Sequence, residues 1–285
     1  MVKSVKRILL KHPKDAFINQ TKIDSESIKL NYTSPPDFQI ACKQYDSFLK
    51  LIYAFNPDVH FMPISEKSSL DSIYTRDSCI ITNNGIILCN MGKRARSNEP
   101  NEMNEYFSSI GIPIIGRIEN PGTLEGGDIL WIDDKTIAVG EGYRSNAEGI
   151  EQLKNILGNQ VSEFISVPLP HWNGSKDCLH LMSNVSPIDY DLFLVYSRLL
   201  PVSFREYLLY RKIKLIEVSD EEYNSMGGNV LAMEKRKVIM VKGNPITQKS
   251  LENEGVEVCT YDGSEISLKG AGGPTCLTRP FFRSS

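Results

Sequence analysis

The chain has 285 residues, of which 41% are hydrophobic and 24% charged, and its formal net charge at pH 7 is −3. This balance is ordinary for a globular protein with a sizeable core, and it argues against the basic face that a nucleic acid or an anionic membrane would require. No stretch approaches the ~20 apolar residues that span a bilayer, and six cysteines without a CxxC pair argue against a disulfide framework and a zinc site.

The N-terminal region predicts a strand over residues 6–11 and a helix over residues 35–55. The apolar run of the strand ends at Lys11-His12-Pro13, far short of the apolar region of a signal peptide, so a cytoplasmic protein with reduced thiols is expected. Ser34 is the predicted N-cap of the helix and Pro35 its first residue.

A unit made of a hairpin, a helix and a strand then begins at Asp77. Short apolar runs flank Asn83-Asn84-Gly85, which is a strong hairpin signal. The apolar spacing that follows predicts a helix over residues 102–110 and a strand over residues 112–118.

A second copy of this unit begins at Glu125, 48 residues after Asp77. Its helix is predicted to carry Ala147, Ile150, Leu153 and Leu157, and its strand to run near residues 161–167. The triplet Arg-Ser-Asn occurs at positions 96–98 and again at 144–146, at the same offset of 48 residues. The unit openings and the Arg-Ser-Asn triplets recur at the same offset, which supports a repeat.

Three looser copies open at His180, Met226 and Cys276. The third copy predicts a return strand over residues 192–196 and a helix near residues 204–210. The fourth copy begins with Met226-Gly227-Gly228-Asn229, which is similar to Glu125-Gly126-Gly127-Asp128. Its return strand is predicted over residues 238–241.

Five such units predict a five-bladed, pseudosymmetric α/β propeller formed by a single domain over residues 1–285. The fifth unit is cut short by the C-terminus, so the N-terminal strand and helix should complete it.

The residues that open the units should face one axis, and four of the five carry chemistry: Asp77, Glu125, His180 and Cys276. A cysteine supplies a nucleophile, a histidine moves protons and carboxylates hold positive charge. Taken singly, each has a structural interpretation as a buried thiol, a core histidine or a turn carboxylate. Their matching places in the repeat favour the functional interpretation.

Motifs in this order along nearly the whole chain resemble the guanidino-group-modifying enzymes, namely dimethylarginine dimethylaminohydrolase, arginine deiminase and the amidinotransferases. The motifs are Tyr74-Thr75-Arg76-Asp77, Glu125-Gly126-Gly127-Asp128, Arg144-Ser145-Asn146, His180-Leu181 and Gly272-Gly273-Pro274-Thr275-Cys276-Leu277-Thr278. The resemblance implies the pentein-like five-bladed α/β propeller, in agreement with the repeat count.

The resemblance also implies catalytic roles. Cys276 attacks the guanidino carbon, and His180 protonates the departing amine and later activates water. Glu125 orients the histidine and faces the substrate cation. Asp77 hydrogen-bonds the guanidinium, whose planar fork suits a carboxylate.

Further substrate-binding residues follow from the same resemblance. Arg96 and Arg144 match the pair that grips the substrate carboxylate, and Asp71 matches the position that meets the α-ammonium. Asp128 joins this set as the last residue of its motif, and Phe17 belongs to a loop that resembles a mobile lid. The implied partner is a small guanidino molecule without metal or cofactor, and residues 270–273 show neither a GxGxxG pattern nor a P-loop lysine. A homodimer is left open.

Two positions bear on the subfamily. Met182 stands where deiminases and amidinotransferases generally have an aspartate that reaches the guanidinium; methionine tolerates methyl groups instead. The chain also shows no added helical domain of the deiminase type. Arg76, by contrast, stands where the dimethylarginine enzymes often have an acid, and it favours the deiminase and amidinotransferase pattern.

The predicted function is therefore hydrolysis of dimethylarginine to citrulline and dimethylamine through a covalent thiouronium on Cys276. Arginine deiminase or arginine dihydrolase is the second interpretation, and amidinotransferase the third. The propeller also resembles that of a ribosomal-subunit anti-association factor, which binds without catalysis. Such a binding module has no reason to keep a cysteine, a histidine and two acids on one axis.

Overall fold

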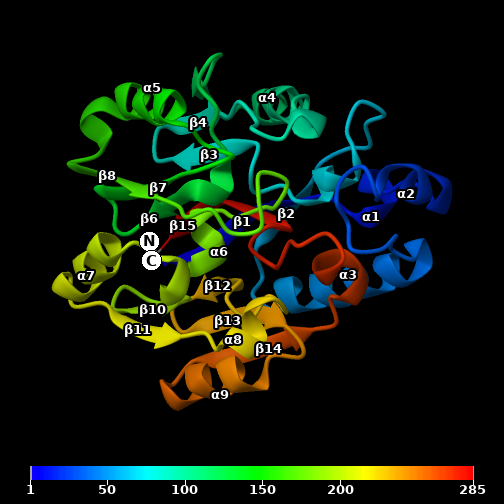
Figure 1. The fold of residues 1–285 in the computed structure, drawn as a ribbon. Helices are drawn as coiled ribbons and strands as arrows, with labels where there is room; N and C mark the ends of the chain where they lie inside the picture. Colours follow the sequence, from blue (N-terminus) through cyan, green and yellow to red (C-terminus); the bar gives the residue numbers. More distant parts are fainter. Residues whose placement is uncertain (1, 285) are drawn as a thin grey trace. The chain divides into compact units, whose positions relative to one another are not determined.

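The computed structural model describes residues 2–284, and in that range the chain forms five three-stranded sheets of one topology (Figure 1). The sheets are β3 (Cys79–Thr82), β4 (Gly85–Leu88) and β5 (Ile114–Arg117); β6 (Ile129–Trp131), β7 (Thr136–Glu141) and β8 (Glu163–Pro168); β9 (Val185–Pro187), β10 (Leu192–Val195) and β11 (Lys214–Glu217); β12 (Val230–Glu234), β13 (Lys237–Val241) and β14 (Glu257–Tyr261); and β15 (Thr278–Ser284), β1 (Ser4–Leu10) and β2 (Asp58–Phe61).

In each sheet the central strand pairs antiparallel with one neighbour and parallel with the other. A helix connects the two parallel strands, as such a crossover requires. In the order of the sheets above, these helices are α4 (Glu99–Ser109), α5 (Ala147–Leu157), α7 (Val202–Tyr210), α9 (Pro245–Asn253) and α3 (Phe38–Tyr53). Five repeats of an antiparallel strand pair, a connecting helix and a parallel strand confirm the predicted α/β fold class.

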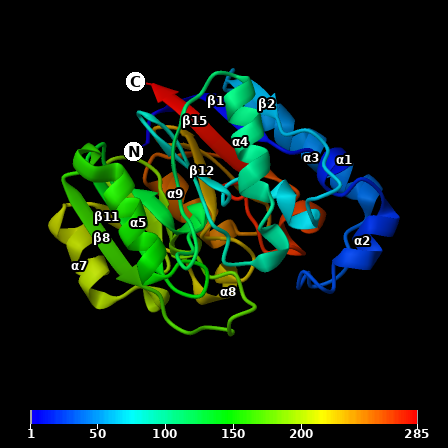
Figure 2. The ribbon, with the colours of Figure 1, turned by 90° about the horizontal axis from the view of Figure 1, so that it is seen from above.

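The N-terminal strand completes the last blade, as predicted. Figure 2 shows β1 and β15 side by side, and the two strands run antiparallel with Ser4 opposite Ser284 and Leu10 opposite Thr278. On its other edge β1 pairs with β2 in parallel. This blade therefore joins the two ends of the chain.

The predicted start of the N-terminal helix is wrong. The helix begins at Phe38 rather than Pro35, and Asp37 rather than Ser34 is its N-cap, with a carboxylate that accepts the N–H of Ile40. The cause is Pro36, because the residue before a proline is disfavoured in the α region and so Pro35 does not open a helix. The helix also ends at Tyr53, two residues before the predicted end.

The chain divides into two compact units, each with its own core. One unit runs to Thr75 and resumes at Asn184, and the other is Arg76–Ser183, which holds β3 to β8. The first core includes Tyr45, Phe48 and Ile52 of α3. The second core includes residues of β3, β4, β7 and α5. The expected single domain over residues 1–285 stays a prediction.

The described residues also form four short α-helices. They are α1 (Pro13–Ala16), α2 (Gln20–Glu26), α6 (Leu181–Asn184) and α8 (Asp220–Tyr223). Among residues 2–284, no helix combines the length and apolarity that crossing a membrane requires.

Candidate active site

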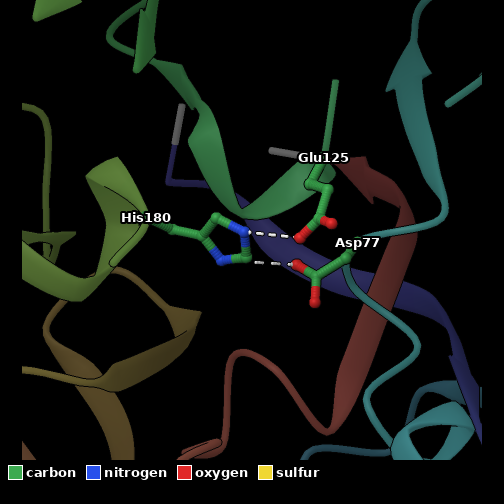
Figure 3. Close-up of side chains that lie close together, drawn as sticks. All are labelled: Asp77, Glu125 and His180. Carbon is green, nitrogen blue, oxygen red and sulfur yellow. Dashed lines mark hydrogen bonds and ion pairs between the residues drawn. The ribbon is translucent and has the colours of Figure 1, made fainter. Parts of the chain in front are cut away.

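Three predicted site residues meet inside the Arg76–Ser183 unit. Asp77 precedes β3, Glu125 precedes β6 and His180 precedes α6, so each lies at the opening of its repeat. The Nε2 of His180 is 2.8 Å from Glu125 Oε2, and its Nδ1 is 3.8 Å from Asp77 Oδ1. Figure 3 shows the imidazole facing both carboxylates. All three side chains are buried.

Gly127 makes this meeting possible. A Cβ at position 127 would overlap the His180 ring and lie 2.8 Å from Asp77 Oδ1. Gly127, the second glycine after Glu125, is therefore required for space beside the histidine, since only glycine allows this close approach.

The charges of the site hold His180 in its protonated form. Burial alone would lower the pKa of His180, but the sulfur of Cys178 and the carboxylates of Asp128 and Asp77 outweigh burial and raise that pKa well above its usual value. For Glu125, burial would raise the pKa, but the hydrogen bond and charge of His180 and the charge of Arg144 outweigh it and lower the pKa. His180 and Glu125 thus form an imidazolium–carboxylate pair. In this form His180 can donate a proton.

The two predicted carboxylate-binding arginines are buried in ion pairs. Arg96 Nη1 donates to Asp77 Oδ2. The Nε and Nη2 atoms of Arg96 donate to the two carboxylate oxygens of Glu99 at 2.9 and 2.8 Å. Arg144 Nη1 is 3.3 Å from Glu125 Oε2. Each arginine thus neutralises the acid that opens its own repeat. Glu99 is a partner that the sequence reasoning missed, although it lies one helical turn after Arg96.

Arg96→Met should therefore destabilise the fold strongly. The substitution leaves Glu99 and one oxygen of Asp77 buried without their cation, which typically costs about 3–5 kcal/mol. Urea unfolding of the variant measures this loss. The control is Arg198→Met, since Arg198 is 73% exposed in its pair with Asp220 and such pairs contribute at most about 1 kcal/mol. Equal losses in the two variants would contradict the buried network.

Asp128 supports the turn that carries the histidine. Its Oδ1 accepts the N–H of Leu181 at 2.9 Å, and its Oδ2 accepts the hydroxyl of Ser145 at 2.6 Å. Burial raises the pKa of Asp128 to about 6. Ser145 was missed as a functional residue, and the signal that could have found it is the repeated Arg-Ser-Asn triplet, since its hydroxyl also accepts the N–H of Glu125.

Met182 and Arg76 are in contact within the same unit. Met182 lies on α6, two residues after His180, and is 7% exposed. Arg76 Nη2 donates to Met182 Sδ at 3.0 Å. A second thiol, Cys178, lies 3.6 Å from His180 Nδ1.

Three predicted site residues belong to the other unit. Cys276 lies in the turn before β15, where Asn229 Nδ2 is 3.4 Å from its sulfur. Asp71 is buried in the short 3₁₀ helix Leu70–Ile73. Phe17 caps α1 and is fully buried in the hydrophobic core. The substrate and lid roles of Asp71 and Phe17 stay predictions.

Asp77, Glu125 and His180 also have the spacing of a metal-binding group. Each offers one ligand atom, and these atoms lie within 4.8 Å of one another. Arg96 and Arg144 already balance the two carboxylates. This cluster of one imidazole and two carboxylates has the groups that proton transfer and the binding of a positive charge require.

Comparison with known proteins places this geometry in a family. Residues 12–283 match the family described as N,N dimethylarginine dimethylhydrolase, eukaryotic. The chain is 27% identical over 256 residues to N(G),N(G)-dimethylarginine dimethylaminohydrolase of Pseudomonas aeruginosa, covering 90% of this chain and 94% of that protein. It is 26% identical over 256 residues to an arginine deiminase of Staphylococcus haemolyticus, covering 74% of this chain and 61% of that protein.

A solved structure agrees with these similarities. A mutant of the Pseudomonas aeruginosa dimethylarginine dimethylaminohydrolase, complexed with citrulline, matches with a TM-score of 0.79 and 25% identity, covering 98% of this chain and all of that one. The similarities and the buried imidazolium–carboxylate pair indicate a hydrolase that acts on the carbon–nitrogen bonds of guanidino compounds. The chain belongs to the N,N-dimethylarginine dimethylhydrolase family, within the guanidino-group-modifying enzymes.

Proposed function

We propose that this protein hydrolyses Nω-methylated arginines to citrulline and an alkylamine, with Cys276 as the nucleophile. The observation that carries the substrate assignment is Met182, an apolar side chain two residues after His180 in the buried cluster. The relative from Pseudomonas aeruginosa, a dimethylarginine dimethylaminohydrolase by name, supports the same substrate.

The contact between Arg76 and Met182 strengthens this assignment. A guanidinium with free N–H groups requires acceptors on every side, but arginine has only donors and a thioether is a weak acceptor. Arg76 already donates to the Met182 sulfur. The pair therefore offers few hydrogen-bond acceptors to an unmethylated nitrogen. The methyl groups of a methylated nitrogen can pack against the methionine without loss of a hydrogen bond.

In the proposed reaction, the Cys276 thiolate forms a bond to the guanidino carbon. The carbon–nitrogen bond to the alkylamine then breaks, and the departing nitrogen takes the proton of His180. Neutral His180 next accepts a proton from water as the oxygen attacks the thiouronium carbon. The carbon–sulfur bond breaks and the remaining hydroxyl proton passes to solvent, which returns the thiolate and releases citrulline. Glu125 keeps the imidazole oriented in both steps through the 2.8 Å contact to Nε2.

Substrate binding is proposed to exchange existing ion pairs for new ones. The substrate guanidinium takes a position against Asp77, and the substrate carboxylate binds Arg96 and Arg144. Glu99 keeps its hydrogen bonds to Arg96 during this exchange, so that arginine stays in place. Asp71 is proposed to meet the α-ammonium.

The substrate assignment predicts the behaviour of Met182→Asp. The wild-type enzyme should have a kcat/KM for monomethylarginine and asymmetric dimethylarginine at least equal to that for arginine. An aspartate at position 182 adds an acceptor that methylated nitrogens leave unpaired, so the preference should shift toward arginine by at least about a hundredfold. Measurement of kcat/KM for the three substrates in both proteins decides the matter.

Met182→Leu is the matched control for this substitution. Leucine keeps the site apolar and should retain the preference for methylated substrates. A strong preference of the wild-type enzyme for unmethylated arginine would overturn the assignment. It would instead support arginine deiminase, which the Arg76-Asp77 pattern and the deiminase relative favour as the second candidate.

A further inference from the structure

Asn229 lies against the sulfur of Cys276. Asn229 directly precedes β12 and is 6% exposed, and Cys276 lies two residues before β15 in the same unit. The side-chain nitrogen Nδ2 is 3.4 Å from Sγ. None of the roles derived above uses this asparagine.

The orientation of the Asn229 amide is determined by its neighbour Thr275. The backbone N–H of Thr275 donates to Oδ1 at 3.0 Å, and the Thr275 hydroxyl donates to the same oxygen at 2.9 Å. A backbone N–H can only donate, so the amide oxygen must face Thr275. The NH₂ group must then face the sulfur of Cys276.

The glycines before Cys276 leave the space that this contact needs. A Cβ at Gly273 would overlap the side chain of Asn229, and a Cβ at Gly272 would overlap the ring of Tyr74. Substitution at Gly273 would therefore displace the asparagine from the sulfur. The Gly-Gly pair thus has a specific steric reason in the packing around Cys276.

Two buried phenols interact electrostatically with Cys276. Burial raises the pKa of Tyr74 and of Tyr261, and the charge of Cys276 raises both further. Tyr74 directs its hydroxyl to the carbonyl of Ile266, and Tyr261 shares a hydrogen bond with Ser267. A neutral amide N–H stabilises an anion without titrating, and Asn229 supplies one at the sulfur.

The repeat explains why an asparagine stands at this position. Asn229 and Asp128 both follow a Gly-Gly pair, three residues after the residue that opens their repeat. Asp128 accepts the N–H of Leu181, the residue after His180, and Asn229 accepts the N–H of Thr275, the residue before Cys276. Each side chain supports the turn that bears the reactive group of the following repeat.

The chemical difference between the two side chains matches the two reactive groups. A carboxylate beside His180 stabilises the imidazolium, whereas a carboxylate beside Cys276 would repel a thiolate. The amide keeps the acceptor oxygen and replaces the other oxygen with a donor. We propose that Asn229 stabilises the thiolate of Cys276 through Nδ2–H, which deepens the proposed function and rests on its assignment of Cys276 as the nucleophile.

The test is the pH dependence of Cys276 alkylation by iodoacetamide without substrate, followed by mass spectrometry. Asn229→Asp keeps an acceptor for Thr275 but removes the donor, so the midpoint of the alkylation profile should rise. At a pH below both midpoints, alkylation should be roughly tenfold slower for each unit of that rise. Asn229→Leu removes the donor without adding charge and should shift the midpoint in the same direction.

Asn253→Asp is the matched control, because it makes the same chemical change at an exposed position on α9. It should leave the midpoint unchanged, and alkylation of Cys259 should be equal in all proteins. An unchanged Cys276 midpoint in either folded Asn229 variant overturns the inference. If the midpoint rises but methylarginines are not hydrolysed, the contact is supported and the substrate assignment fails.

Discussion

Replacement of Cys276 by serine should reduce the hydrolysis of guanidino substrates by at least about a thousandfold in kcat, as loss of a catalytic nucleophile does elsewhere. A serine hydroxyl is far harder to ionise than a thiol, and the NH₂ group of Asn229 at 3.4 Å from the sulfur cannot compensate for that difference. The turn that carries residue 276 depends on Thr275 and Asn229. The fold and the binding of substrate should therefore survive.

Cys259→Ser is the control for this variant, since Cys259 lies in the same unit and is likewise partly buried. Its kcat should equal that of the wild-type enzyme. Mass spectrometry of the wild-type enzyme, quenched during turnover, should find the adduct on Cys276. An adduct on any of the other five thiols would refute the assignment: Cys42, Cys79, Cys89, Cys178 or Cys259.

His180→Gln should lower kcat by about 10²- to 10⁴-fold, the range for loss of a general acid and base. Glutamine can still donate a hydrogen bond to Glu125, so the variant removes the proton transfer while it preserves that contact. Because the raised pKa keeps His180 protonated at neutral pH, the lost function is protonation of the leaving amine. The loss should be much smaller for an arginine analogue whose leaving group is a thiol, which departs without a proton.

Comparison of kcat for the two leaving groups, in wild type and variant, measures this effect. His171→Gln is the control, because His171 is exposed and contacts Tyr143. That variant should keep the wild-type kcat for both substrates. If His180→Gln slows both leaving groups equally, His180 has a structural role and does not act as the acid.

Much of the fold follows from local sequence signals. The four apolar residues predicted to lie on one helix, namely Ala147, Ile150, Leu153 and Leu157, all lie on α5. The hairpin signal at Asn83-Asn84-Gly85 lies between β3 and β4. Apolar periodicity and turn chemistry act over a few residues, so a linear pattern reports them. The predicted start of α3 was wrong because Pro36 disfavours the α region at Pro35, so that Asp37 rather than Ser34 is the N-cap.

The sequence by itself also determined where the reactive groups stand, since a repeat assigns equivalent places to Asp77, Glu125 and His180 before any contact is known. It could not reveal that Arg96 is buried between Asp77 and Glu99. Nor could it show that Asn229 turns its amide toward Cys276. These facts depend on the desolvation of charged side chains and on side-chain orientation. Both are decided only when distant segments pack together.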